Sequence, residues 1–209
     1  MILSGKANHV QVAIAKKSFR DDPHCGDECA YWADGNEVTL CVVDGLGHGG
    51  AAEEAAQAAV SYVGRHLAES LLDIFTGCDR AIRHTRGGVM GIAIVDTAEG
   101  ALTYAGVGNP RAMVVRAQQG TLSRYNVKRL SSVPGTVGMG IKRLLPETIP
   151  LNPGDLVILF TDGIPEKMDL RHYDDALFED VDVLAKQILQ DWGRKSDDAA
   201  ILLFKNEGA

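Results

Sequence analysis

Aspartate residues stand at the ends of the most apolar runs of this chain, and this placement restricts its fold more than any other feature. Asp44 follows one such run and precedes Gly45, and Asp162 repeats the pattern before Gly163. A carboxylate beside a buried strand loses its hydration, so it needs a positive partner or its pKa rises until it is neutral. The fold must therefore supply a compensating charge at these strand ends.

The same kind of acidic position recurs at Asp27 and at the pair Asp197 and Asp198, each of which adjoins an expected strand. The chain has 21 Lys and Arg against 28 Asp and Glu, and none of the basic residues directly flanks Asp44 or Asp162. A lone Asp-Gly pair usually marks a β-turn, but turn chemistry does not explain why each acid ends a strand. Clustered carboxylates suit hard divalent cations, so the sequence predicts a site for Mg²⁺ or Mn²⁺.

The composition is that of one globular domain spanning residues 1–209. The formal net charge of −7 opposes binding to nucleic acid and to anionic lipid. The beginning of the chain lacks the apolar core of a signal peptide, and no apolar run approaches the ~20 residues of a membrane span. We therefore expect a cytoplasmic protein that binds neither nucleic acid nor membrane.

Hydrophobic periodicity, with Gly and Pro between the periodic runs, predicts the secondary structure. Strands are expected at 9–15, 37–43, 89–95, 102–107, 111–116, 122–125, 155–160 and 199–204, and helices at 49–72, 74–84 and 181–192. The strands between 89 and 125 follow one another closely and indicate an antiparallel meander. Because strands outnumber helices and do not alternate with them, the class is α+β, with helices packed on antiparallel sheets.

Six short motifs, in this order and spacing, resemble the bacterial SpoIIE/RsbX-like branch of the PP2C-type phosphatases. They lie at 25–27, 43–49, 86–87, 106–111, 161–163 and 194–198, so the resemblance spans nearly the whole chain. It implies a four-layer α-β-β-α sandwich with two antiparallel sheets, and a centre of two divalent cations, Mn²⁺ or Mg²⁺. It also implies hydrolysis of phosphoserine or phosphothreonine by an activated water.

By position, the resemblance assigns the site residues as follows. Asp44 would bridge both cations, Asp27 and the carbonyl of Gly45 would hold one, Asp162 and Asp197 the other, and Asp198 would support these ligands from behind. Catalysis would then rest on Asp44, Asp162 and Asp197. The implied substrates are phosphorylated STAS-domain proteins of the stressosome, and we expect a monomer.

Several positions depart from the family pattern. Leu46 stands where eukaryotic members carry a histidine thought to protonate the leaving group, and His48 is not its equivalent but a polar residue expected to cap the helix. Arg20 is the nearest match to the phosphate-binding arginine. Bacterial relatives often read Asp-Asp-x-Thr at the last motif, where this chain has Ala200 in place of threonine. The missing hydroxyl is expected to loosen the support of the ligands.

Other interpretations stay open at this point. The chain could be a catalytically weak or inactive phosphoprotein-binding module that keeps the fold. Residues 45–50 satisfy G-x-G-x-x-G after a strand, which is the context of a dinucleotide-binding site. Cys25 and Cys29 form a C-x3-C pair, which is a weak indication of zinc against ordinary reduced thiols.

Overall fold

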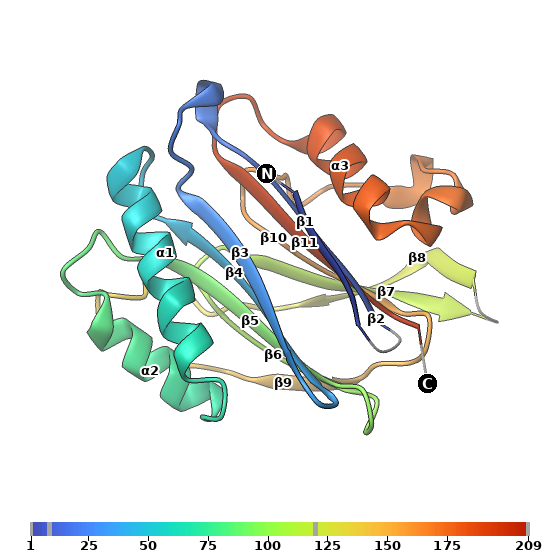
Figure 1. Cartoon of the computed structure of the whole chain (residues 1–209), viewed down its shortest axis with the longest axis horizontal. Helices are drawn as coiled ribbons and strands as arrows, with labels where there is room; N and C mark the ends of the chain where they lie inside the picture. Colours follow the sequence, from blue (N-terminus) through green and yellow to red (C-terminus); the bar gives the residue numbers. More distant parts are fainter. Residues whose placement is uncertain (1, 8–9, 119–120, 208–209) are drawn as a thin grey trace.

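Two antiparallel β-sheets lie face to face in the computed structural model of the chain, and helices cover both outer faces (Figure 1). The structure describes residues 2–7, 10–118 and 121–207. Helices α1 (Gly50–Arg65) and α2 (Leu71–Ala81) lie on one side, and α3 (Val181–Trp192) lies on the other. The expected α+β class and four-layer α-β-β-α arrangement are therefore confirmed.

Every ladder between the named strands is antiparallel. Sheet A has the order β1-β2-β11-β10-β7-β8, with β1 Ile2–Ala7, β2 Val10–Lys17, β7 Arg111–Gln118, β8 Thr121–Leu130, β10 Leu156–Phe160 and β11 Ala199–Asn206. Sheet B has the order β3-β4-β5-β6-β9, with β3 Asp27–Asp34, β4 Glu37–Gly45, β5 Gly88–Asp96, β6 Ala101–Val107 and β9 Glu147–Pro150.

The three expected helices are present, but two of them have other bounds. The predicted helix at 49–72 is too long, since α1 ends at Arg65, and the helix predicted at 74–84 is α2, which spans Leu71–Ala81. The Ser70 side chain accepts the backbone N–H of Asp73. Ser70, which was predicted to lie inside a helix, is therefore the N-cap of α2. Helix α3 has the predicted bounds. None of the helices in the described part of the chain has the length and apolar character needed to cross a membrane.

The predicted meander between 89 and 125 is wrong. Strands β5 and β6 belong to sheet B, whereas β7 and β8 belong to sheet A. The chain crosses between the sheets at the turn 108–110, where Gly108 has a φ of 93°. Strands β1, β3 and β9 had no counterpart in the prediction, and His9 of the predicted strand 9–15 lies outside the described residues. Strand β3 was not predicted because it carries acids at both ends and few strongly apolar residues.

Three apolar clusters hold the layers together. The first fills the space between the sheets and includes Leu40, Tyr104 and Leu159. The second packs α3 on sheet A, and the third packs α1 and α2 on sheet B. Central strands are therefore covered on both faces, which is why every residue of β10 is apolar and buried. Charged side chains are therefore found beyond the ends of β10 and not along it.

The turn after β10 passes so close to the beginning of β11 that a side chain does not fit at position 163. A Cβ atom on Gly163 would overlap the carbonyl oxygen of Asp198 and lie 2.8 Å from the Cα of Ala199. The Gly163 carbonyl accepts a hydrogen bond from the N–H of Arg194 at 2.8 Å. This close approach brings Asp162 near Asp197 and Asp198, which precede β11.

We predict that Gly163→Ala lowers the free energy of unfolding by about 3 kcal/mol or prevents folding, because backbone would have to move to accept the methyl group. Gly50→Ala is the matched control, since a Cβ there would meet only the His24 ring at 3.7 Å. The control should raise the free energy of unfolding by about 0.5 kcal/mol. Urea denaturation measures both. Equal stability of the two variants would contradict the close approach.

Candidate metal centre

The five predicted aspartates come together at one end of the two sheets. Asp27 and Asp44 are cross-strand partners in sheet B. Asp162 follows β10, and Asp197 and Asp198 precede the neighbouring strand β11 in sheet A. Mutual repulsion acts between Asp44 and each of the three acids of sheet A. The face-to-face packing of the sheets therefore joins acids that are more than a hundred residues apart in the sequence.

A threonine links the two sheets beside these acids. The Thr161 hydroxyl donates to Oδ2 of Asp27 at 2.6 Å and accepts the N–H of Ala200 at 2.9 Å. Thr161 and Asp27 are both buried. Thr161 thus fixes the Asp27 carboxylate relative to sheet A. The sequence analysis missed this role, although the hydroxyl beside Asp162 in an otherwise apolar run was a usable signal.

Asp198 supports the backbone around the cluster. Its Oδ1 accepts the N–H of Phe19 at 2.7 Å, and its Oδ2 accepts the N–H of Gly26 at 2.9 Å. Asp198 is buried, so these charge-assisted hydrogen bonds compensate the loss of hydration. Both of its oxygens are engaged by backbone donors, and its carboxylate holds the segment that leads to Asp27.

Asn109 is a second partner that the sequence analysis did not single out. Its Nδ2 donates to Oδ2 of Asp162 at 2.5 Å. Its Oδ1 is buried and has no hydrogen-bond partner among the described residues. Asn109 lies in the turn between β6 and β7, where the chain passes from one sheet to the other. Asn109 thus orients the Asp162 carboxylate through its amide N–H.

The acids perturb one another strongly. Burial raises the pKa of Asp44 to about 7, with added repulsion from Asp162, Asp197 and Asp198. Burial, followed by the charge of Asp44, also raises the pKa of Asp27. Burial and the charge of Asp162 raise the pKa of Asp197. None of these carboxylates forms an ion pair with a basic side chain in the part of the chain that the structure describes.

The donor set fits a hard divalent cation. It consists of carboxylate and backbone oxygens of buried and half-buried residues, and no basic side chain of the described residues pairs with these acids. Among residues 2–7, 10–118 and 121–207, no three His, Cys, Asp or Glu side chains already stand close enough to form a metal cage. Thr161 holds an oxygen of Asp27, Asn109 holds an oxygen of Asp162, and backbone N–H groups hold the oxygens of Asp198.

Gly45 is needed for helix packing. Its N–H donates to the Gly26 carbonyl at 2.9 Å, and a Cβ on Gly45 would overlap the carbonyl oxygen of Ala52 in α1. Gly45 is the last residue of β4, and its buried position lets α1 approach the strand that carries Asp44. The backbone of Gly45 thereby lies between the aspartate cluster and the first turn of α1.

Arg20 and His48 lie beside the cluster around one aromatic ring. The Arg20 guanidinium is 4.8 Å from the centroid of the Phe19 ring, and the His48 ring is 5.7 Å from it. Both side chains are exposed. The expected capping role of His48 is wrong, because Gly49 is the N-cap of α1 and no side chain caps this helix. Both side chains thus contact Phe19, whose backbone N–H donates a hydrogen bond to Asp198 of the cluster.

The cysteine pair has the character of ordinary thiols. Cys25 and Cys29 are buried, and neither forms a disulfide. Burial raises the pKa of Cys25 to about 12 and also raises that of Cys29. The Cys25 thiol instead donates to the carbonyl of Lys17 at 3.5 Å, and no group of three His, Cys, Asp or Glu residues in the described part of the chain is placed to hold a metal.

Comparison with known proteins agrees with this geometry. Residues 34–207 match the family model of stage II sporulation protein E, SpoIIE. The chain belongs to the SpoIIE family of PP2C-type phosphatases. It is similar to phosphoserine phosphatase RsbX of Bacillus subtilis (strain 168), with 26% identity over 164 residues that cover 78% of this chain and 79% of RsbX.

Two solved structures extend the comparison. One, from work on the bacterial stressosome as a modular system adapted to control secondary messenger signalling, has a TM-score of 0.83 and 28% identity, and covers 95% of this chain and 100% of that chain. The crystal structure of RsbX in complex with magnesium has a TM-score of 0.81 and 22% identity, and covers 98% of each chain. The expected membership in this SpoIIE/RsbX-like branch is therefore confirmed.

The dinucleotide-binding interpretation of residues 45–50 is wrong. In a βαβ unit the helix would lead to a parallel strand. Here α1 leads to α2 and then to β5, which pairs antiparallel with β4. Of these glycines, Gly45 serves the close packing of β4 against α1, since a Cβ atom there would overlap the Ala52 carbonyl oxygen.

The raised pKa of Asp44 makes the stability of the metal-free protein depend on pH. Between about pH 4, where an unfolded aspartate titrates, and pH 7, the folded state keeps a proton that the unfolded state loses. Stability from this group therefore falls as the pH rises through this window. Asp44→Asn removes the titration, so in EDTA it should gain on the order of 2 kcal/mol over the wild type between pH 5 and pH 8.

Thermal unfolding in EDTA at several pH values measures this difference. Adding Mn²⁺ should raise the Tm of the wild type more at pH 8 than at pH 5, since protons compete with the cation for the same carboxylates. If the difference in stability between wild type and variant did not change with pH, the pKa of Asp44 would not be raised in the folded protein.

Proposed function

We propose that this SpoIIE-family chain is a metal-dependent serine/threonine phosphatase that hydrolyses phosphoserine or phosphothreonine on STAS-domain proteins of the stressosome. We further propose that residues 1–209 act as one catalytic domain, as a monomer in the cytoplasm. The observation that carries the proposal is the set of five aspartates at the common end of two sheets, without a basic partner among the described residues. Such a site attracts divalent cations.

The proposed ligand roles follow the positions of the side chains. Asp44 lies centrally, because it interacts with the acids of both sheets, and it would bridge two cations. Asp27 and the carbonyl of Gly45 would hold one cation, and Asp162 and Asp197 the other. When bound, two Mn²⁺ or Mg²⁺ ions would acidify the attacking water and neutralise the phosphate oxygens.

The other polar side chains keep these ligands oriented. Thr161 holds Asp27 and Asn109 holds Asp162, each by a direct hydrogen bond. Asp198 fixes the backbone at Phe19 and Gly26. Precise orientation matters, because in-line attack on phosphorus tolerates little displacement of the reacting groups.

In this proposal the leaving serine or threonine oxygen would take its proton from water held at the metal centre. Leu46 occupies the position after Gly45 and carries no titratable group, and it is 38% exposed. Leu46 therefore cannot act as the acid, and water would have to supply the proton. Slower hydrolysis than in relatives with a histidine there is the expected consequence.

The substrate class is supported by charge and by similarity. The net charge of −7 disfavours nucleic-acid phosphates. The similar proteins are a phosphoserine phosphatase, RsbX, and a protein from work on the bacterial stressosome. A phosphorylated STAS-domain scaffold protein of that assembly is therefore the proposed partner.

The proposal predicts release of phosphate from p-nitrophenyl phosphate and from a phosphothreonine peptide with Mn²⁺ or Mg²⁺, and none with EDTA. Asp44→Asn should lower kcat by about a thousandfold or more, because the bridging charge is lost. Asp34→Asn is the matched control, since Asp34 is an exposed acid at the opposite end of β3. The control should keep wild-type activity.

Two outcomes would decide against parts of this proposal. Retained activity in Asp44→Asn would refute the bridging role. Calorimetric binding of two cations without turnover of either substrate would favour the inactive phosphoprotein-binding module.

A further inference from the structure

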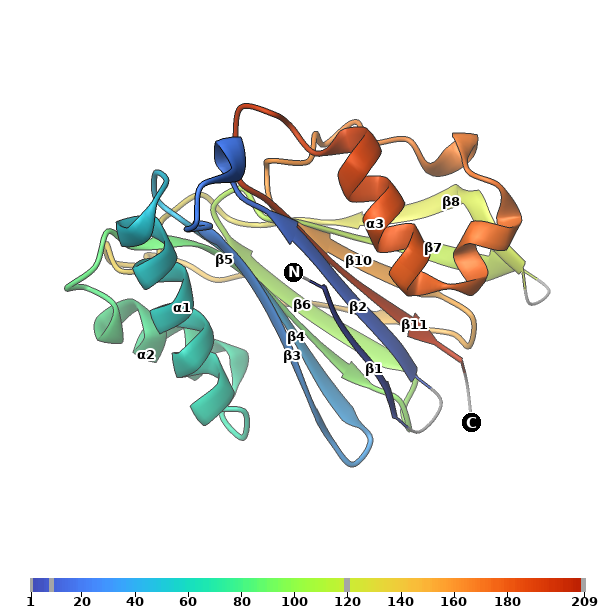
Figure 2. The ribbon, with the colours of Figure 1, turned by 45° about the horizontal axis from the view of Figure 1, so that its top comes forward.

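The segment 131–146, which joins β8 to β9, lies directly beside the aspartate cluster. Val137 exchanges both backbone hydrogen bonds with Gly88, at 3.0 and 2.8 Å. The carbonyl of the adjacent Gly87 accepts the N–H of Leu46 at 3.0 Å. Gly88 also pairs with Gly45 across β4 and β5. Figures 1 and 2 show this segment passing the beginning of β5, so it forms one rim of the site.

A buried acid fastens this rim segment to α2. Oδ1 of Asp79 accepts the N–H groups of Gly138 and Gly140, both at 2.9 Å, and Oδ2 pairs with Arg83 at 3.2 Å. Asp79 is only 4% exposed. Both glycines have φ above 90°, a conformation that other residues rarely adopt. The rim segment is therefore held in one defined shape although it has little regular structure.

The rim presents apolar and basic side chains to solvent. Of the five large hydrophobic side chains exposed in the described part of the chain, Met139 and Leu145 lie in this segment, and Leu46 lies in the loop after β4 that is bonded to Gly87. Lys142 and Arg143 of the segment are exposed, and the whole segment 131–146 contains no Asp or Glu. In a chain of net charge −7 this basic, apolar surface is distinctive.

Arg86 continues this surface toward the aspartates. A Cβ atom on Gly47 would lie 2.9 Å from Nη1 of Arg86, so the guanidinium covers the loop that follows Asp44 and Gly45. Arg86, Lys142 and Arg143 form no ion pair with a carboxylate among the residues that the structure describes. Their charges are available to a binding partner.

We propose that the rim surface, formed by Leu46, Arg86, Met139, Lys142, Arg143 and Leu145, docks acidic and apolar residues that flank the phosphorylated serine or threonine of the substrate protein. This inference rests on the proposed phosphatase function. The aspartate cluster repels acidic residues, so a substrate with an acidic flank needs cations immediately outside the cluster. Charges placed this way speed association and select partners, while exposed apolar side chains add contact area.

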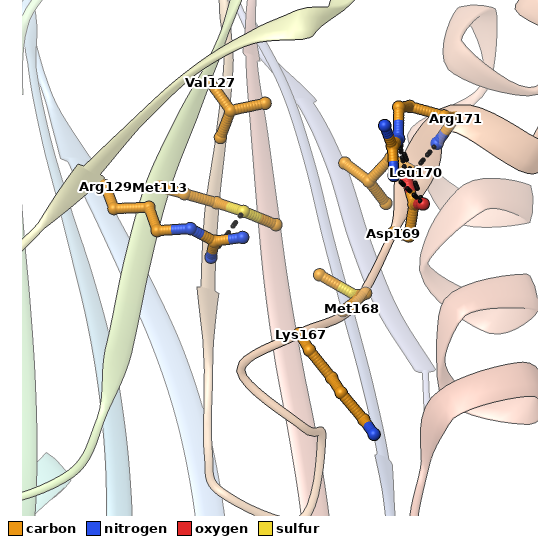
Figure 3. A pocket seen from close by; sticks show the side chains of 8 residues that line it. All are labelled: Met113, Val127, Arg129, Lys167, Met168, Asp169, Leu170 and Arg171. Atoms are coloured by element: carbon orange, nitrogen blue, oxygen red, sulfur yellow. Dashed lines mark hydrogen bonds and ion pairs between the residues drawn. The ribbon is translucent and has the colours of Figure 1, made fainter.

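A second basic surface offers the comparison that the test needs. A cavity of about 300 Å³ lies on the outer face of sheet A, between β7, β8 and residues 167–171 (Figure 3). Its Arg171 is bound by Asp169 through hydrogen bonds of 2.6 to 3.0 Å, and its Arg129 rests on the sulfur of Met113. Figure 3 shows Lys167 pointing away from Arg129. These side chains do not converge on one point, so this surface serves as the control.

The decisive experiment compares two double variants with the same change of charge. Lys142→Glu with Arg143→Glu reverses two charges of the rim surface. Arg129→Glu with Lys186→Glu reverses two exposed charges on the sheet A side. Each is assayed with Mn²⁺ on p-nitrophenyl phosphate and on two phosphothreonine peptides, one flanked by Glu and Leu and one by Lys and Ser. The rim variant should lose about tenfold in kcat/KM on the acidic peptide, through KM, with p-nitrophenyl phosphate unchanged. The control variant should change kcat/KM on either peptide by less than about twofold.

Asp79 provides an independent test as a positioning residue. Asp79→Ala releases Gly138 and Gly140 and should raise KM for the acidic peptide about fivefold without changing kcat on p-nitrophenyl phosphate. Asp79→Asn keeps an oxygen at Oδ1 for the same two N–H groups and should restore most of the loss. A merely structural role would lower kcat on both substrates together.

Binding of the labelled acidic phosphopeptide to Asp44→Asn, followed by fluorescence anisotropy, separates docking from turnover. Reversing Lys142 and Arg143 in that background should weaken binding about tenfold. Equal losses in the rim and control variants, or no preference of the wild type between the two peptides, would overturn the docking surface. If the wild type hydrolyses no substrate with either metal, the phosphatase proposal fails, while the anisotropy result still decides the docking surface.

Discussion

Two hydrogen bonds that cross from one sheet to the other hold the acidic end of this molecule together. Thr161 of sheet A donates to Asp27 of sheet B, and Gly26, next to Asp27, donates to Asp198 at the beginning of β11. The apolar side chains between the sheets supply most of the attraction, but apolar contact is not directional and does not fix the carboxylates. The crossing bonds do fix them, against the mutual repulsion of the acids.

Much of this arrangement could be predicted because the sheets are covered on both sides. A strand buried on both faces is apolar along its whole length, so β10 and β11 and the acids at their ends stand out in the sequence. Helix α3, with its periodic apolar face, was predicted with its observed bounds. What the sequence could not provide was the partner of each strand. The strands from 89 to 125 have similar patterns, yet the turn at Asn109 sends half of them to the other sheet.

The hydrogen bonds that hold the carboxylates were hidden from the sequence for the same reason. Ala200 lacks the hydroxyl that the last motif of bacterial relatives often carries, and by sequence this position suggested a loosened site. In the fold, the Thr161 hydroxyl accepts the N–H of Ala200 and binds Asp27. Thr161 and Ala200 are cross-strand neighbours separated by 39 residues, so their relation follows from strand register and not from local spacing.

Crowding of the acids also explains where positive side chains are found. A lysine or arginine inside the cluster would neutralise the carboxylates and compete with divalent cations for the same oxygens, so basic residues have to remain outside. Arg194 lies near enough to lower the pKa of Asp197, although burial raises it more. Arg86 lies over Gly47, two residues beyond Gly45. A cluster of carboxylates that repels anions thus has basic residues at its edge, and the docking surface that we propose uses them.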